Sequence, residues 1–306
     1  MYSIGIIGIG VLGKALLETY ELLNNNNNDN NDNNDNNDNN DNKNLVIKSY
    51  DKYNNTHIGK TQCNIKCNSI EEMIDCNIIF LCLPTEFCNI KKEYDKTEIY
   101  LVCAKLEELD YKGIVILKST VEPKTTKHLS AIYSKLNIVH NPEFLTARTA
   151  TEDYKNQKHI VLGFVDEYNY TYKNNFEDKE NIIMYLDTFF KLYFPSAKIS
   201  ICSSDESESM KLFCNSFYAT KIQFFTEIKL LCDSLGIEYN NIRSLMLNNE
   251  WINPMHTTIP GPDGNISYGG KCFPKDIEAL REVFEKMEVS HKVIDAVISE
   301  NKEMRK

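Results

Sequence analysis

The chain opens with a short apolar run, Tyr2 to Ile7, and passes directly into Gly8-Ile9-Gly10-Val11-Leu12-Gly13. A run with helical spacing, residues 14–23, comes next. In such a turn the first glycine allows the tight bend, the second lets the backbone approach a pyrophosphate, and the third lets helix and strand pack closely. The free N–H groups of the helix N-terminus attract phosphate. The stretch therefore predicts a dinucleotide-binding strand, turn and helix, with Gly8 to Gly13 at the cofactor.

An acidic residue is expected about 20 residues further on, at the end of the second strand. The strand-like run of residues 45–50 ends at Asp51, which lies 43 residues after Gly8. Residues 24–42 are almost all Asn and Asp, and removing these 19 residues restores the spacing to 24. We therefore predict a disordered insertion at residues 24–42. Asp51 is predicted to bind a ribose hydroxyl, which favours NAD over NADP because a carboxylate repels a 2′-phosphate.

Further apolar strands follow at the spacing of an α/β sheet, over residues 77–83, 113–117, 137–140, 159–164 and 198–202. Ligands of open α/β sheets bind at the carboxyl ends of the strands. The residues after these strands are therefore expected to face cofactor or substrate: Thr85, Ser119, Thr120 and Glu143. The fold class predicted is α/β, a Rossmann-type doubly wound parallel sheet followed by an all-helical domain.

Residues 205–235 read as one long helix that ends at Gly236. Its apolar positions lie on more than one side, which suggests a central helix that also forms a homodimer interface. Lys211 and Asn215 are four residues apart and share a face. We expect an NAD-binding domain over residues 1–203 and a helical domain over residues 204–306.

A second group of reactive residues lies near the C-terminal end, at Gly269-Gly270-Lys271-Cys272-Phe273-Pro274-Lys275-Asp276. Two glycines allow close approach of the backbone. A cation beside a thiol favours the nucleophilic thiolate, and a nearby carboxylate can orient a group or move a proton. Taken alone, the stretch is equally compatible with a turn that contains an incidental cysteine.

Composition narrows the class of protein. The net charge of −10 and the absence of a basic cluster argue against a nucleic-acid partner. No apolar run approaches the roughly 20 residues of a membrane span, and no secretion signal precedes the ten cysteines. Cys63 and Cys67 have no matching second pair, so no metal site is expected. We expect a reduced, cytoplasmic protein.

Taken in order, these motifs resemble the UDP-glucose/GDP-mannose dehydrogenase family, which includes the UDP-glucose 6-dehydrogenases. The pieces that carry the resemblance are residues 8–13, 83–85, 119–121, 141–145, the pair Lys211 and Asn215, and residues 269–276. The segments 141–145 and 269–276 are the specific ones, and the others support them.

The resemblance implies NAD-dependent oxidation of a nucleotide sugar, with UDP-glucose the first expectation, from primary alcohol to uronic acid. Cys272 would attack the intermediate aldehyde and later carry a thioester. Glu143 or Asp276 would activate water, and Lys211 and Asn215 would stabilise oxyanions. The resemblance also places Lys275 near the cofactor, and Phe144, Leu145 and Gly269 at the substrate.

The sequence departs from the family in several places. Ala147 and Arg148 stand where the family has a second Glu and a Gly, and we expect the protein to lack the family's usual third domain. Two alternatives stay open. One is a β-hydroxyacid dehydrogenase, which shares the glycine turn and the Lys-x-x-x-Asn helix but needs no cysteine. The other is a catalytically degenerate family member that binds NAD or pairs with a partner.

Overall fold

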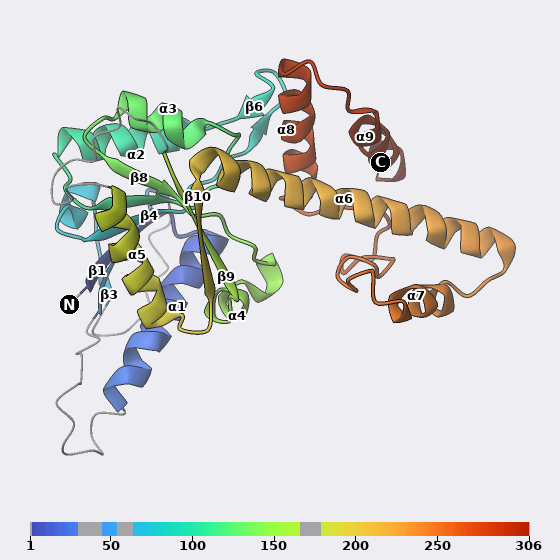
Figure 1. Ribbon diagram of the computed structural model, residues 1–306, viewed down its shortest axis with the longest axis horizontal. Helices are drawn as coiled ribbons and strands as arrows, with labels where there is room; N and C mark the ends of the chain where they lie inside the picture. Colours follow the sequence, from blue (N-terminus) through green and yellow to red (C-terminus); the bar gives the residue numbers. More distant parts are fainter. Residues whose placement is uncertain (1, 30–44, 54–63, 166–178, 306) are drawn as a thin grey trace. The chain divides into compact units, whose positions relative to one another are not determined.

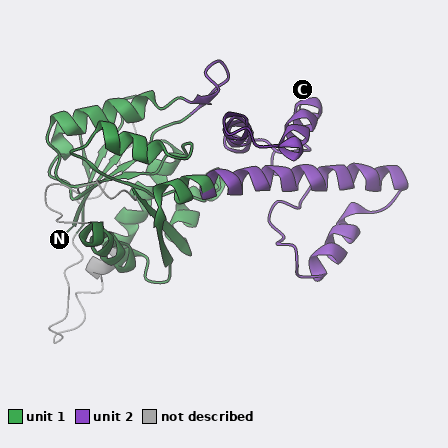
Figure 2. Cartoon of the chain, turned by 45° about the horizontal axis from the view of Figure 1, so that its top comes forward, with its two compact units in different colours: residues 1–85, 95–209 green, residues 86–94, 210–306 purple. Residues whose placement is uncertain are grey.

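The computed structural model describes residues 2–29, 45–53, 64–165 and 179–305 of the 306-residue chain, with residues 25–29 described by their backbone alone. The chain forms two compact units. Unit 1 comprises residues 1–85 and 95–209, and unit 2 comprises residues 86–94 and 210–306 (Figure 2). The chain thus passes from one unit to the other at residues 85/86, 94/95 and 209/210. The domain boundary after residue 203 stays a prediction, because compact units and functional domains need not coincide.

Unit 1 is built on an eight-stranded sheet with the strand order β10-β9-β8-β7-β4-β1-β2-β3 (Figure 1). Its strands are parallel except where β8 pairs antiparallel with β9. This confirms the predicted α/β class with a mostly parallel sheet of Rossmann type. The bounds are β1 Tyr2–Ile7, β2 Leu45–Tyr50, β3 Asn64–Lys66, β4 Ile78–Leu81, β7 Ile114–Leu117, β8 Asn137–His140, β9 His159–Phe164 and β10 Lys198–Ser203.

Helices cover both faces of this sheet, because side chains along each strand alternate between faces. Ile78 and Phe80 of β4 belong to one core cluster, whereas Ile79 and Leu81 belong to the other. The first cluster includes residues of α1 (Val11–Asp29), α4 (Ala150–Lys155) and α5 (Lys179–Tyr193), and the second those of α2 (Thr97–Glu108) and α3 (Thr125–Ile132). Burial on both faces explains why the central strands are continuous apolar runs.

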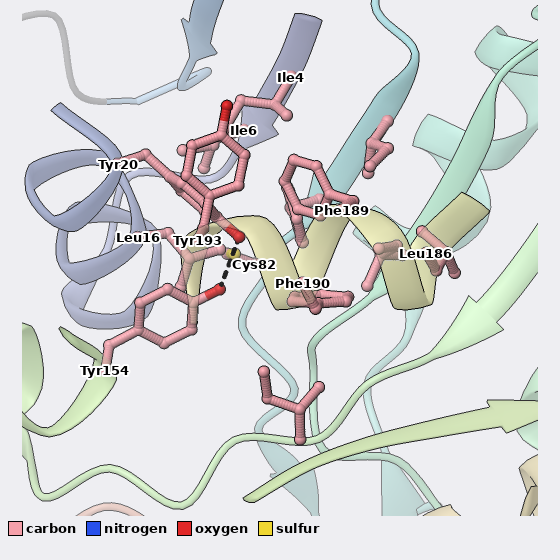
Figure 3. Packing of buried hydrophobic residues seen from close by; sticks show 14 of the residues in the cluster. Ile4, Ile6, Leu16, Tyr20, Cys82, Tyr154, Leu186, Phe189, Phe190 and Tyr193 are labelled. Atoms are coloured by element: carbon pink, nitrogen blue, oxygen red, sulfur yellow. Dashed lines mark hydrogen bonds between the residues drawn. The ribbon is translucent and has the colours of Figure 1, made fainter. Parts of the chain in front are cut away.

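Aromatic side chains fill the first cluster. Tyr20 of α1 lies against Tyr154 and Phe189, with its ring centroid 6.1 and 5.8 Å from theirs, and its hydroxyl lies 3.4 Å from that of Tyr154 (Figure 3). The ring centroids of Tyr20 and Phe80 are 6.0 Å apart. Tyr20 is fully buried, and burial raises its pKa well above the usual value. This packing fixes α1 on the sheet and so fixes the glycine turn at its N-terminus.

The Asn/Asp-rich insertion differs from the prediction at its start. Helix α1 continues to Asp29, six residues into the range expected to be disordered, and residues 30–42 lie outside the described residues. The side chain of Asn24 donates to the carbonyl oxygen of Leu45 (3.2 Å) and accepts from its N–H (3.1 Å). This buried two-way contact joins the two ends of the insertion, which explains why the helix does not end at Asn24.

The long helix α6 (Ser204–Leu235) begins in unit 1 and continues into unit 2. Ser203 and Glu206 form a reciprocal cap at its start: the Ser203 N–H donates to Glu206 Oε2 (2.8 Å), and Ser203 Oγ accepts from the Glu206 N–H (3.2 Å). It ends as predicted at Gly236, which has φ +69°, while the Ile237 N–H donates to the Cys232 oxygen (2.9 Å).

Three further helices pack around α6 within unit 2: α7 (Tyr239–Asn248), α8 (Phe273–Lys286) and α9 (Lys292–Met304). The sequence of residues 276–305 alone predicts one continuous helical run, but this part of the chain forms two helices, which are separated where Glu288 adopts φ +55°. A hairpin that the sequence did not predict, β5 (Phe87–Cys88) with β6 (Glu93–Tyr94), also belongs to this unit. Its Phe87 and Tyr94 pack with Leu280 and Phe284 of α8.

Candidate active site

The glycine turn has the geometry that its spacing predicts. Gly8 adopts φ +91°, and a Cβ there would lie 2.7 Å from the Cys82 carbonyl oxygen. A Cβ on Gly13 would lie 1.9 Å from the Gly8 carbonyl oxygen, so helix and turn could not approach as they do. At Gly10 a Cβ would meet nothing within 4 Å. The space beside Gly10, at the start of α1, therefore suits a pyrophosphate held by backbone N–H groups. Val11 is exposed, Leu12 is half-buried and Ile9 is buried.

Asp51 follows β2 and lies beside this turn. Its Oδ2 accepts from the Ile9 N–H (2.6 Å), and its Oδ1 accepts from the Tyr53 N–H (2.9 Å). Each carboxylate oxygen can accept two hydrogen bonds, so the same group can also accept from ribose hydroxyls. A cavity of about 200 Å³ opens here, lined by Ile7, Gly8, Tyr50, Asp51, Lys52, Tyr53, Ile70, Leu83, Pro84, Glu98, Leu101 and Val102. Its largely apolar lining suits the base of an adenosine.

The polar residues after β4 and β7 join their two loops to each other. Ser119 Oγ donates to the Leu83 oxygen (2.7 Å) and accepts from the Leu83 N–H (3.1 Å). Thr85 Oγ1 donates to the Thr120 oxygen (2.7 Å). Thr85 and Ser119 are buried, so they hold the carboxyl ends of the strands in place. Direct contact of Thr85, Ser119 and Thr120 with a cofactor stays a prediction.

Glu143 follows β8 in the same unit. Its Oε2 accepts from the Leu145 N–H (2.6 Å), a local turn that orients the carboxylate. Leu145 packs against the first core cluster, whereas the side chain of Phe144 is 41% exposed. Ala147 and Arg148, at the family's second Glu and Gly, lie in a short 3₁₀ turn, Ala147–Thr149. Glu143 is thus anchored, with an exposed aromatic neighbour.

In unit 2 the cysteine lies at the start of a helix. Cys272 is exposed and occupies the N-cap position of α8, with Pro274 in the first turn. A negative charge is favoured at this end of a helix, so the position suits a thiolate. Gly270 adopts φ +76°, and a Cβ on Gly269 would lie 2.1 Å from Arg305 Nη1. The two glycines therefore allow the turn and the close approach of Arg305, the C-cap residue of α9.

One helical turn after the cysteine, Asp276 is fully buried and accepts three hydrogen bonds. Its Oδ1 accepts from the Tyr94 hydroxyl (2.6 Å) and from Lys275 Nζ (2.6 Å), and its Oδ2 accepts from Asn215 Nδ2 (2.6 Å). Lys275 Nζ also lies 4.4 Å from the centre of the Tyr94 ring. We call these four residues the Asp276 cluster: Tyr94, Asn215, Lys275 and Asp276. The structure thus brings together three residues that the sequence singled out.

Lys211 lies one turn before Asn215 on α6, and both side chains are buried. Their shared face is therefore turned to the interior, not to solvent. The residue that sequence reasoning missed is Tyr94. It lies 182 residues from Asp276 in a two-residue strand, so neither spacing nor periodicity could have indicated it. Glu143 belongs to unit 1 and the Asp276 cluster to unit 2.

Two further observations concern the part of the chain that the structure describes. It holds no group of three His, Cys, Asp or Glu side chains placed to bind a metal ion. None of its helices combines the length and hydropathy that a bilayer crossing requires.

Fold and site together define a dinucleotide-binding protein of Rossmann type, because a glycine turn, the Asp51 carboxylate and a cavity meet at the carboxyl ends of β1 and β2. Family models extend this assignment. The NAD-binding domain of the UDP-glucose/GDP-mannose dehydrogenase family matches residues 2–177, and the central domain of that family matches residues 205–303. The chain belongs to this family.

Comparisons with individual proteins find members of the same family. UDP-glucose 6-dehydrogenase of Rickettsia bellii is 28% identical over 243 residues, which cover 76% of this chain and 51% of that protein. The structure of a UDP-glucose dehydrogenase from Pyrobaculum islandicum matches with a TM-score of 0.77 and 21% identity, over 99% of this chain and 68% of that one. A 3-hydroxyisobutyrate dehydrogenase of Mycobacterium tuberculosis matches with a TM-score of 0.65 and 12% identity, over 98% and 92%. The chain spans about half the length of the first curated relatives that it matches.

Proposed function

We propose that the chain catalyses NAD-dependent oxidation of a nucleotide sugar, with UDP-glucose the first candidate, from primary alcohol to uronic acid. The observation that carries this proposal is Cys272 at the N-terminus of α8, one turn before the Asp276 cluster. The single-oxidation chemistry of simpler dehydrogenases has no use for a thiol, whereas conversion of an alcohol to an acid uses a covalent carrier at the aldehyde stage. The Rickettsia bellii relative is named for the same substrate.

The cofactor would bind unit 1 through residues 8–13 and Asp51, and two NAD molecules, bound one after the other, would each accept one hydride. Lys211 and Asn215 would stabilise the negative charge that develops on the substrate oxygen, as cation and amide donor. Cys272 would add to the aldehyde carbon and form a thiohemiacetal, and the second oxidation would leave a thioester on its sulfur. Water would then release the acid and regenerate the thiol.

We assign the activation of water to Glu143 and not to Asp276. Asp276 has 0% exposure, and both of its oxygens accept hydrogen bonds from residues of its cluster. A carboxylate in that setting orients its donors, because charge-assisted hydrogen bonds fix their positions. Glu143 is half-buried beside the exposed Phe144. Lys275 would act through Asp276, in addition to its proposed place near the cofactor.

A β-hydroxyacid dehydrogenase is the second candidate. The mycobacterial 3-hydroxyisobutyrate dehydrogenase matches this chain over nearly the full length of both, and Lys211 with Asn215 would serve such a reaction equally well. That reaction consumes one NAD per substrate and makes no use of Cys272. A third reading, a degenerate member that binds NAD without turnover, is motivated by Ala147 at the family's second Glu position.

We also propose that two copies of the chain associate through α6. Large apolar side chains at Phe213, Phe217, Phe224, Leu231 and Leu235 are 51–62% exposed. At 100° per residue these five positions fall within a stripe about 40° wide. A narrow apolar stripe along a helix is typical of a helix-to-helix seam, and a second copy offers the matching surface.

A panel of UDP-, GDP- and dTDP-sugars with NAD tests the function. We expect one sugar to yield two NADH per molecule consumed, and Cys272→Ser to abolish acid formation while NADH binding survives. Cys214→Ser, a half-buried cysteine on α6, is the matched control and should retain activity. One NADH per substrate with full turnover in Cys272→Ser would favour the hydroxyacid reading. Cofactor binding without turnover on any sugar would favour the degenerate reading.

A further inference from the structure

The cavity beside the glycine turn has charges of both signs at one side. Asp51 and Glu98 bring two carboxylates to its lining, and Lys52 brings an ammonium. Lys52 follows the predicted ribose-binding aspartate directly. A lysine at that point is suited to bind a 2′-phosphate, which would weaken the preference for NAD that Asp51 provides. The charge of Lys52 therefore opposes the preference for NAD that the neighbouring Asp51 is predicted to provide.

A carboxylate on helix α2 compensates the charge of Lys52. Glu98, in the first turn of α2, accepts from Lys52 Nζ at 3.2 Å and from the Tyr53 hydroxyl at 3.2 Å, both through Oε1. The side chain of Glu98 is 29% exposed and that of Lys52 is 51% exposed. One carboxylate thus holds both polar side chains that follow Asp51, and it balances the charge of the lysine.

We propose that Glu98 is a specificity-determining residue that excludes the 2′-phosphorylated dinucleotide by holding the Lys52 ammonium in an ion pair. Asp51 repels the phosphate directly, and Glu98 withdraws the nearby cation that would otherwise attract it. The proposal rests on the proposed use of NAD by unit 1, and it does not depend on which sugar is oxidised.

Direct binding tests it without any turnover. NADH and NADPH are titrated separately into the full chain by calorimetry at fixed ionic strength, and the ratio of their dissociation constants is compared between variants. We expect Glu98→Gln to tighten NADPH binding about tenfold, as the release of one nearby charge allows, with NADH binding little changed. The gain should shrink at high salt, where exposed charges are screened.

Two further variants test whether the change in NADPH binding comes from the ion pair of Lys52 with Glu98. In a Lys52→Met background, Glu98→Gln should bring no gain, because no cation is left to release. Glu108→Gln removes a carboxylate from the exposed end of the same helix and should leave the ratio unchanged.

An unchanged ratio in Glu98→Gln, with NADH still bound, would overturn the proposal alone. A gain of the same size in the Lys52→Met background would overturn the role of the lysine. Failure of the unaltered chain to bind NADH would overturn the cofactor assignment, and this inference with it.

Discussion

Asp276 is the point at which the polar contacts of unit 2 converge. It is a buried carboxylate with a lysine, an amide and a phenol around it. Leaving a buried charge short of a donor is costly. The Asp276 carboxylate therefore fixes the positions of all three donors relative to one another. Tyr94 contributes to the site in this way, although we assign it no part in the chemistry.

Tyr94→Phe should lower the free energy of unfolding by about 2 kcal/mol, because a hydrogen bond to a charged group contributes about 1.5–3 kcal/mol. Urea unfolding of the full chain measures this. The matched control is Tyr239→Phe, which removes a buried hydrogen bond to a neutral acceptor, the Thr257 oxygen (2.6 Å), and should cost about 1 kcal/mol. Equal losses in the two variants would contradict a special role for the contact with Asp276.

Sequence could predict Cys272, Asp276, Lys211 and Asn215 as a group of interest, because each lies in a short motif with local spacing. It could not predict how Asp276 is used. A carboxylate near a cysteine reads equally well as a base or as a positioning group, and our proposal of a positioning role rests on the burial of Asp276 and its three hydrogen bonds. No motif or periodicity in the sequence around Tyr94 indicates its contact with Asp276.

Among the elements, the central strands could be predicted because burial on both faces requires continuous apolar runs. The hairpin of β5 and β6 could not, since two-residue strands have no periodicity and their stability comes from packing on α8. The break between α8 and α9 was missed because the apolar pattern continues across it. Helix α1 begins at Val11, three residues before the predicted run of residues 14–23 and inside the glycine turn, and it continues beyond its apolar run, where Asn24 contacts Leu45.

Helices α3 and α6 are linked by a buried carboxylate. Glu208 Oε1 accepts from the Thr126 N–H (2.7 Å) and the Thr126 hydroxyl (2.6 Å), so α6 supplies the cap that Lys124, the N-cap residue of α3, does not. Glu208 Oε2 is buried, and within the described part of the chain no donor approaches it with the geometry of a good hydrogen bond. Burial raises the pKa of Glu208 to about 7, although the bonds from Thr126 oppose the shift and Asp205 adds to it.

This raised pKa predicts a pH-dependent stability. The folded chain binds the proton of Glu208 more tightly than the unfolded chain, whose pKa is near 4.5. Its contribution to stability is therefore complete below pH 4.5 and is lost as the pH rises to about 7, a loss on the order of 3 kcal/mol. Glu208→Gln keeps the capping oxygen and should flatten this dependence, as urea midpoints at pH 5 and pH 8 will show.

Glu206→Gln, which removes an exposed charge two residues earlier on α6, is the control and should follow the unaltered chain. The idea fails if the difference in midpoint between Glu208→Gln and the unaltered chain is the same at pH 5 and pH 8.

In the assembled protein, the stripe on α6 should govern oligomeric state. Phe217→Glu together with Phe224→Glu should convert a dimer into a monomer in sedimentation experiments at micromolar concentration, because charges would be buried in an apolar seam. Leu245→Glu, on the exposed surface of α7, introduces the same charge outside the stripe and should leave the dimer intact. A dimer that survives both phenylalanine substitutions would place the contact elsewhere.

The path of the chain between its units constrains how the protein can be divided. A nick at residues 209/210 would leave Tyr94 and its hairpin on the N-terminal fragment, although their packing partners on α8 lie in the C-terminal one. Nicking there would not by itself release the fragments, since the hairpin would still join them. A C-terminal fragment made separately would keep Cys272 but lose a donor to Asp276. No single cut in the chain therefore separates unit 1 from a fragment that contains all of unit 2.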